Sequence, residues 1–181
     1  DTCRRQRQMC IRDSNKVALI RNSRKGENPN LIEYASACIN AGADGITVHP
    51  RPDQRHVKPS DLPGLKELIN KHTNIEFNIE GNPFEEAKDD YLGLLELVKR
   101  SRPHQCTLVP DSTDQLTSDH GFDLNKNQEK VYKVVRELRA HGVRSSLFLD
   151  PDLAQIRLAA EIGVDRVELY TCLLYTSPSP R

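Results

Sequence analysis

The chain has 181 residues, of which 36% are hydrophobic and 29% are charged, and its 26 basic residues balance its 26 acidic residues. This length fits one domain with a sizeable core, since domains usually hold about 100–200 residues. The balanced charge argues against a protein that binds nucleic acid through a basic surface. No apolar run approaches the roughly 18 residues needed to span a bilayer, so no membrane partner is expected.

The five cysteines include no CxxC pair, which removes the signature of a zinc ribbon or a thioredoxin-type centre. An odd number of cysteines in a polar chain fits a reducing cytoplasm better than a disulfide scaffold. Residues 1–14 are basic but lack the apolar core of a signal peptide. We therefore expect a cytoplasmic protein.

Apolar periodicity predicts strands that alternate with helices. The expected strands cover residues 44–49, 75–79, 105–109, 145–149 and 166–170. The expected helices begin near residues 28, 60 and 82 and then include 131–138 and 153–162. A polar segment, 110–125, shows little periodicity, and loops of this length are usually functional or disordered. The alternation predicts a parallel sheet built from strand–helix–strand units.

Two parallel architectures compete, the open doubly wound sheet and the (β/α)8 TIM barrel. No GxGxxG or GxxxxGK[ST] motif follows a strand, which removes the strongest indication of a nucleotide-binding open sheet. Polar residues lie at or near the expected carboxyl ends of successive strands, namely His49, Glu76, the loop after Val109, Asp150 and Glu168. A barrel gathers strand ends into one ring, so we favour the barrel. The chain would hold strands about 2 to 6, because a full barrel takes about 250 residues.

The densest polar cluster is GITVHPRPDQRH, residues 45–56, which contains His49, Arg51, Arg55 and His56. Arginine forks match phosphate oxygens, and a nearby imidazole can transfer protons. The alternative is a solvated charged loop with one histidine at a strand tip. A metal site at the two histidines is disfavoured, because no neighbouring carboxylate has metal-ligand spacing.

Two glutamates interrupt strand-like segments, Glu76 in IEFNIEGN and Glu168 in RVELY. A carboxylate in an apolar strand needs a partner or a cavity, and burial would raise its pKa toward neutral, as suits a general base. Glu76 could instead face a cationic side chain at the end of a helix. Glu80 and the Gly81–Asn82 turn are equally possible ligand contacts.

Two further segments offer polar groups. Arg24 lies in a short basic turn, which could bind a phosphate or remain an exposed turn. The long loop offers hydroxyls at Thr117 and Ser118, and residues 119–121 could close over a ligand as a lid.

Six strings resemble the pyridoxine 5′-phosphate synthase family. They are RNSR, AGADGITVHPRPDQRH, EFNIEGNPFEE, PHQCTLVPDSTDQLTSDHGFDL, SLFLDPD and AAEIGVDRVELYT, and the match runs in order from about Asn15 to Thr171. The resemblance implies a (β/α)8 barrel, usually a homo-octamer, that needs no metal or organic cofactor. It also implies condensation of 1-deoxy-D-xylulose 5-phosphate with 3-amino-2-oxopropyl phosphate to pyridoxine 5′-phosphate, phosphate and water.

The resemblance implies a role for individual residues. His49 matches a proton-transferring histidine, Glu76 a general base and Glu168 a glutamate that steadies the transition state. The matched substrate-binding positions are Asn15, Lys16, Arg24, Arg51, His56 and Thr117. Asn15 and Lys16 stand where many members carry Asp-His.

Both ends depart from the family pattern. Residues 1–14 place Asp13 where a substrate-binding asparagine belongs, and residues 172–181 replace a glycine-rich loop that two further strands should follow. We expect a partial barrel domain at 15–171, flanked by segments that are not native to the family, and no activity from the 181-residue chain alone. Two alternatives are another phosphate-binding TIM-barrel enzyme and a non-catalytic fragment that acts through exposed sheet edges.

Overall fold

The computed structural model describes residues 9–10, 13–115 and 118–171. Its strands are β1 (Met9–Cys10), β2 (Gly45–Val48), β3 (Glu76–Gly81), β4 (Gln105–Leu108), β5 (Arg144–Leu149) and β6 (Arg166–Leu169). Its helices are α1 (Asp13–Asn22), α2 (Leu31–Asn40), α3 (Leu62–Asn70), α4 (Leu94–Ser101), α5 (Leu124–Ala140) and α6 (Leu153–Ile162), with a 3₁₀ turn, Pro59–Asp61, before α3. In this part of the chain, no helix has the length and apolar character required to cross a bilayer.

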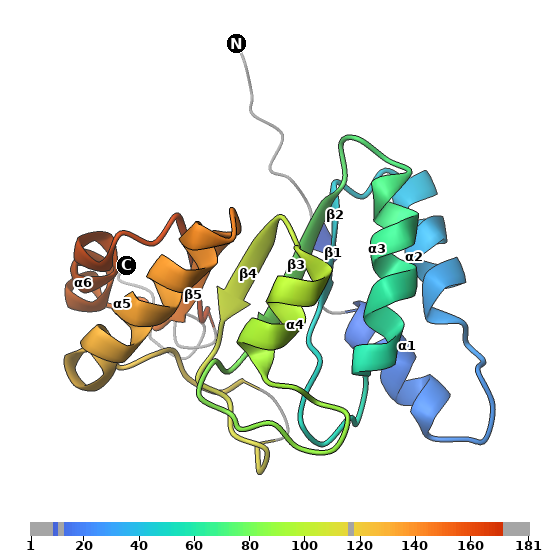
Figure 1. Ribbon diagram of the computed structural model, residues 1–181, viewed down its shortest axis with the longest axis horizontal. Coiled ribbons are helices and arrows are strands. Elements are labelled where there is room, and N and C mark those ends of the chain that lie inside the picture. Colours follow the sequence, from blue (N-terminus) through green and yellow to red (C-terminus); the bar gives the residue numbers. More distant parts are fainter. Residues whose placement is uncertain (1–8, 11–12, 116–117, 172–181) are drawn as a thin grey trace, which may run out of the picture.

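The six strands form one parallel sheet in which each strand pairs with the next along the chain (Figure 1). A doubly wound sheet would reverse its strand order at a switch point, whereas a barrel keeps the sequence order. The strands therefore form part of a (β/α)8 barrel, and the predicted fold class is confirmed.

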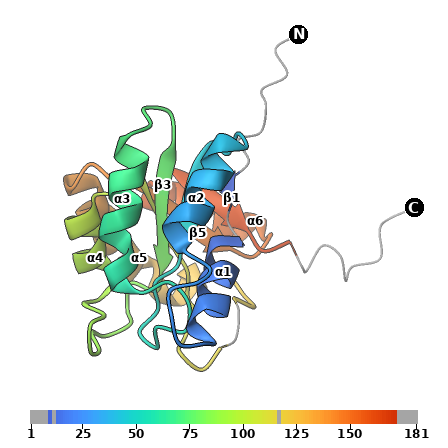
Figure 2. The same ribbon diagram turned by 90° about the vertical axis from the view of Figure 1, so that its right-hand side faces the viewer.

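The two faces of the sheet differ in polarity, because side chains alternate along each strand. Buried apolar residues on one face join the hydrophobic core with the helices: Ile46, Val48, Phe77, Ile79, Cys106, Leu108, Leu147 and Leu149. Helices α2 and α3 pack side by side over this sheet (Figure 2). On the other face, Asn78 donates to Thr47 Oγ1 at 3.3 Å and accepts from Thr107 Oγ1 at 3.1 Å. This polar face is the inner wall of the barrel, and we call it the inner face.

Side-chain caps fix three helix starts. Asn30 accepts hydrogen bonds from the amides of Ile32 and Glu33, so α2 begins at Leu31 rather than near residue 28. Asp123 and Asp152 cap α5 and α6 in the same way. Such caps satisfy amides that have no partner inside the helix.

Three elements differ from the sequence prediction. The helix expected near residue 82 begins only at Leu94, because Asn82 Oδ1 accepts the amide of Phe84 in a local turn and Gly93 adopts a φ of 86°. Helix α1 was not predicted, and its apolar residues show little facial periodicity. Strand β1, at residues 9–10, brings the number of strands to six and lies within the segment expected to be foreign to the domain.

Gly121 is packed against the end of β5. A Cβ at this position would lie 2.3 Å from the amide nitrogen of Asp150 and 2.4 Å from the Cα of Leu149. We expect Gly121→Ala to lower the free energy of unfolding by roughly 3 kcal/mol, since backbone must move to relieve the overlap. Urea unfolding monitored by circular dichroism measures the effect. Gly64→Ala is the control, because its Cβ would meet only the side chain of Ile32, with Cδ1 at 3.1 Å and Cγ1 at 3.5 Å. Equal losses in the two variants would contradict the expectation.

Candidate functional site

Five polar side chains gather at the carboxyl ends of β2, β3 and β4, and we call them the carboxyl-end cluster. They are His49, Arg51, His56, Glu80 and Asp111. His49 follows β2, Glu80 is the penultimate residue of β3, and the Asp111 carboxylate pairs with Arg51 at 3.3 Å. The rings of His49 and His56 lie 5.8 Å apart. Four of the five residues are more than 90% buried, and His56 is partly buried.

The carboxyl-end cluster holds buried polar atoms that lack hydrogen-bond partners. Within the described part of the chain, these atoms are Arg51 Nε, His56 Nδ1, Glu80 Oε1 and Asp111 Oδ1. Proteins rarely leave buried polar atoms unsatisfied, because each one costs desolvation free energy. A concentration of four such atoms at the carboxyl end of a barrel sheet indicates a place for a polar ligand.

Two arginines hold the long loop over the cluster. Arg51 Nη2 donates to the carbonyls of Ser112 at 2.5 Å and Gln115 at 3.1 Å. Arg55 donates to the carbonyls of Thr113 at 2.7 Å and Gln115 at 3.0 Å. The loop is therefore fastened to the residues that sequence reasoning assigned to phosphate binding. Thr117, in the same loop, lies outside the described residues.

Helix α1 supports the segment that carries His56. Asn22 Nδ2 donates to the carbonyl of His56 at 2.7 Å, and Arg21 forms a two-pronged ion pair with Asp61 at 2.7 and 2.9 Å. Sequence reasoning missed Arg21 and Asn22. Their partners lie more than 30 residues away, so local spacing carries no signal for them.

The remaining substrate-binding candidates from α1 and its end lie in different surroundings. Asn15 Oδ1 accepts the amide of His49 at 3.0 Å, which ties α1 to the cluster. Lys16 and Arg24 are exposed. Among the described residues, the structure gives the side chains of Lys16 and Arg24 no hydrogen bond or ion pair with the cluster.

Glu76 lies at the opposite end of the inner face. It is the first residue of β3, so its predicted place near a carboxyl strand end is wrong. Its carboxylate forms ion pairs with Arg144, at the start of β5, and with Arg166, at the start of β6, the latter at 3.2 Å. Burial alone would raise the pKa of Glu76, but the hydrogen bonds from the two arginines outweigh it and lower the pKa. The expectation of a raised pKa is therefore also wrong, and Glu76 is ionised at neutral pH.

Glu168 shares the inner face with Glu80. It is partly buried on β6, two residues after Arg166, whose side chain contacts Gln105 and Glu76 on this face. The pKa of Glu80 is raised well above its usual value by burial, then by the negative charges of Glu168 and Asp111. The structure thus brings His49, Arg51 and His56 together with Glu80 and Asp111. Sequence reasoning named Glu80 only as an alternative. It did not single out Asp111, which lies in the predicted polar loop, three residues after the end of β4.

Both histidines of the cluster are neutral at pH 7. Burial lowers the pKa of His49 to about 3, with further lowering by the positive charges of His56 and Arg51. Burial, then the charge of Arg51, lowers the pKa of His56 to about 4. Neutral imidazoles can accept protons, which suits groups that begin a reaction as bases.

We expect the free energy of unfolding to fall as the pH drops from about 6.5 to 4. The unfolded chain takes up protons on these histidines below pH 6.5, whereas the folded chain keeps them neutral, so acid favours unfolding. For His49 the loss is about 3 kcal/mol at pH 4. Urea titrations across this range test it, and His49→Gln should flatten the pH dependence. An unchanged slope in His49→Gln, or the same flattening in the control His141→Gln at the exposed end of α5, would contradict the assignment.

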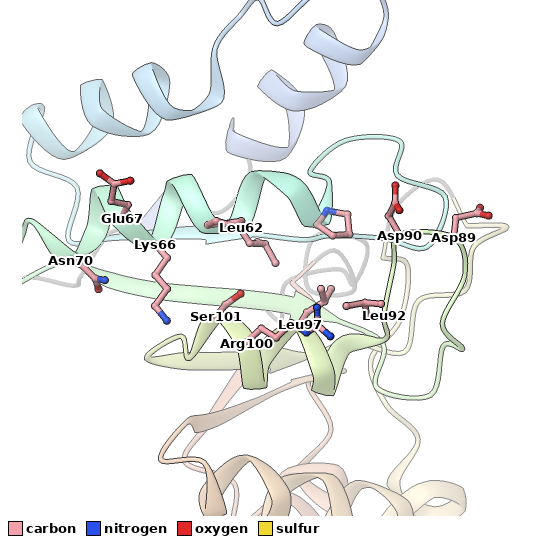
Figure 3. Close-up of a pocket in the computed structure, with 12 residues that line it drawn as sticks. Leu62, Lys66, Glu67, Asn70, Asp89, Asp90, Leu92, Leu97, Arg100 and Ser101 are labelled. Carbon is pink, nitrogen blue, oxygen red and sulfur yellow. The ribbon is translucent and has the colours of Figure 1, made fainter.

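A recess of about 650 Å³ lies away from this cluster, between α3 and α4 (Figure 3). Lys66, Asn70 and Arg100 line it together with Leu62 and Leu97. None of the five residues of the carboxyl-end cluster lines this recess. Among the described residues, no group of three histidine, cysteine or carboxylate side chains is arranged to hold a metal ion.

Comparison with known proteins identifies the family. The sequence profile described as "Pyridoxal phosphate biosynthesis protein PdxJ" matches residues 13–177. The chain belongs to the PdxJ family. The resemblance to the pyridoxine 5′-phosphate synthase strings is thereby confirmed over nearly the whole chain.

Curated relatives from the PdxJ family share about half of the residues. Proteins named "Pyridoxine 5'-phosphate synthase" from Xanthomonas axonopodis pv. citri and Xylella fastidiosa are 51% and 52% identical over 157 residues, or 87% of this chain. The chain spans 61% and 60% of their lengths. A solved 3-hexulose-6-phosphate synthase has a TM-score of 0.52 at 13% identity and covers 92% of this chain and 75% of its own. That likeness concerns the fold alone.

Proposed function

We propose that a protein carrying this sequence is a pyridoxine 5′-phosphate synthase. It condenses 1-deoxy-D-xylulose 5-phosphate with 3-amino-2-oxopropyl phosphate to pyridoxine 5′-phosphate, inorganic phosphate and water. The observation that carries the proposal is 51% identity over 157 residues to a relative of that name. The buried polar atoms of the carboxyl-end cluster that lack hydrogen-bond partners support the binding of a polar substrate at this cluster.

The proposed chemistry needs groups that bind phosphate and groups that move protons. His49, Glu76 and Glu168 are the proposed catalytic residues. Neutral His49 stands at the carboxyl end of β2 in the form that accepts a proton, whereas Glu76 is ionised but lies at the opposite end of the inner face. The proposed substrate-binding residues are Asn15, Lys16, Arg24, Arg51, His56 and Thr117. Arg51 would contact an anionic substrate through Nε, since its Nη atoms already serve Asp111 and the long loop.

The assembly and cellular location are part of the same proposal. We propose a cytoplasmic homo-octamer that acts on small phosphorylated substrates without an organic cofactor or metal. Sedimentation velocity of a protein that carries this sequence at the length of its relatives tests the octamer, and a monomer at all concentrations would contradict it.

A direct assay tests the reaction. The same full-length protein is mixed with the two phosphorylated substrates, and the formation of pyridoxine 5′-phosphate is followed by its absorbance and by mass spectrometry. We expect turnover that requires both substrates. Release of phosphate without a pyridine product, or no reaction, would favour another phosphate-handling barrel enzyme or a non-catalytic protein.

A further inference from the structure

The loop after β2 bends around the side chain of Asn22, the last residue of α1. The Nδ2 group shares its two protons among three consecutive backbone carbonyls, those of Gln54 at 3.3 Å, Arg55 at 3.1 Å and His56 at 2.7 Å. Gln54 has a φ of 51°, a left-handed conformation that residues other than glycine seldom adopt. The contacts from Asn22 therefore hold a turn that the loop sequence does not itself favour.

Arg21 fixes the orientation of the Asn22 amide. Its Nε donates to Asn22 Oδ1 at 3.1 Å, so the Nδ2 group must point toward the carbonyls. The Nη2 group of Arg21 also donates to the carbonyl of His56 at 3.3 Å. Asp61 binds the guanidinium through both carboxylate oxygens, and one of them also accepts the amide of Lys58 at 2.8 Å. The end of α1 and the 3₁₀ turn before α3 thus hold the backbone at His56 together.

A fixed backbone matters at His56 because no hydrogen bond at Nδ1 orients the ring. This nitrogen is buried and lacks a partner. The next residue, Val57, is fully buried in the hydrophobic core, so the chain is held on either side of His56. The His56 ring lies 5.8 Å from that of His49, whose amide donates to Asn15 Oδ1 at 3.0 Å. Helix α1 therefore contacts the backbone of both histidine segments, through Asn15 near its start and Asn22 at its end.

We propose that Asn22 is a positioning residue for the synthase reaction, because it holds the backbone of residues 54–56 so that the His56 imidazole meets the sugar-phosphate substrate. This inference rests on the proposed function, in which His56 binds 1-deoxy-D-xylulose 5-phosphate. Asn22 acts through the loop backbone and does not touch the substrate. A displacement of about 1 Å in a positioned group can lower catalytic efficiency by up to about 100-fold. The effect should fall on the sugar phosphate, since His56 is assigned to that substrate.

The test replaces Asn22 by aspartate in a protein that carries this sequence at the length of its relatives. Aspartate has the same size and keeps an acceptor for Arg21, but it turns a negatively charged oxygen toward the three carbonyls. We expect KM for 1-deoxy-D-xylulose 5-phosphate to rise about tenfold or more, whereas KM for 3-amino-2-oxopropyl phosphate changes less than about threefold. The control is Asn74→Asp, in the exposed turn before the start of β3, which should match the wild type.

A double-mutant cycle with His56→Ala shows whether Asn22 acts through His56. In the His56→Ala protein, adding Asn22→Asp should change KM for the sugar phosphate less than about twofold, because the imidazole that Asn22 positions is gone. A loss of stability alone would lower the fraction of folded enzyme and its apparent kcat, but it would leave both KM values unchanged. The split between the two KM values therefore separates positioning from a structural role.

Any one of three results would overturn the inference while the proposed function stands. They are unchanged KM values in Asn22→Asp, an equal rise for both substrates, and the same rise for the sugar phosphate with and without His56. If Asn22→Asp does not fold, Asn22→Ala, which removes the contacts without adding a charge, is measured in its place. Failure of both variants to fold would also overturn the inference, because Asn22 would then serve the fold alone. Absence of wild-type turnover would instead overturn the proposed function, and the inference with it.

Discussion

Replacement of Arg51 by alanine is expected to lower the free energy of unfolding by about 3–5 kcal/mol. Arg51 is 4% exposed and pairs with Asp111, which is also 4% exposed. The change removes the guanidinium and leaves a buried carboxylate without its cation. It also removes the bonds to the carbonyls of Ser112 and Gln115 that hold the long loop. Equilibrium urea unfolding at pH 7 measures the loss.

A matched arginine and a double variant separate the causes. Arg55 contacts the same loop, but a quarter of its side chain is exposed and its ion-pair partner Asp53 reaches solvent, so Arg55→Ala should cost about 1 kcal/mol. Adding Asp111→Asn to Arg51→Ala should recover part of the loss, because no buried charge remains. If Arg51→Ala lowered the free energy of unfolding no more than Arg55→Ala, the buried ion pair between Arg51 and Asp111 would not be a major source of stability.

Replacement of His49 by glutamine is expected to reduce kcat about 10²–10⁴-fold in a protein that carries this sequence at the length of its relatives. His49 is buried at the end of β2, and its lowered pKa keeps the imidazole ready to accept a proton at neutral pH. Glutamine is neutral and of similar size but cannot transfer protons at this pH. Steady-state kinetics with both phosphorylated substrates measure kcat and KM separately.

The control for His49 is His141→Gln, at the exposed end of α5, which should leave kcat unchanged. Below pH 6, the His49→Gln protein should be at least as stable as the wild type, because residue 49 then has no imidazole that takes up a proton on unfolding. An active His49→Gln protein would remove His49 from proton transfer. A loss confined to KM would instead assign His49 to substrate binding.

The barrel could be predicted because each of its longer strands is recognisable from a short stretch of local sequence. Each of the five expected strands overlaps a strand of the structure, since short runs such as GITV and SLFL stand between clear helical patterns. The two-residue β1 is too short for any period to show. The late start of α4 depends on a turn at Asn82 and on the positive φ of Gly93, which apolar spacing does not report.

The site could be predicted only in part. The spacing of GITVHPRPDQRH placed His49, Arg51 and His56 together correctly, because all three belong to one strand end and its loop. Glu76 was different, because its environment depends on Arg144 and Arg166, which lie 68 and 90 residues away. A charge inside a strand shows that a partner is needed, but it does not show whether that partner raises or lowers the pKa. The same reasoning gave no means to choose between Glu76 and Glu80.

A crystal structure of the same full-length protein with 1-deoxy-D-xylulose 5-phosphate tests the central claim most directly. The claim is that the unpaired polar atoms at the carboxyl ends of β2 to β4 receive the phosphorylated substrate. We expect the sugar phosphate within hydrogen-bond distance of Arg51 and His56, with Glu80 Oε1 against a substrate oxygen. A ligand bound elsewhere, for instance in the recess between α3 and α4, would contradict the account.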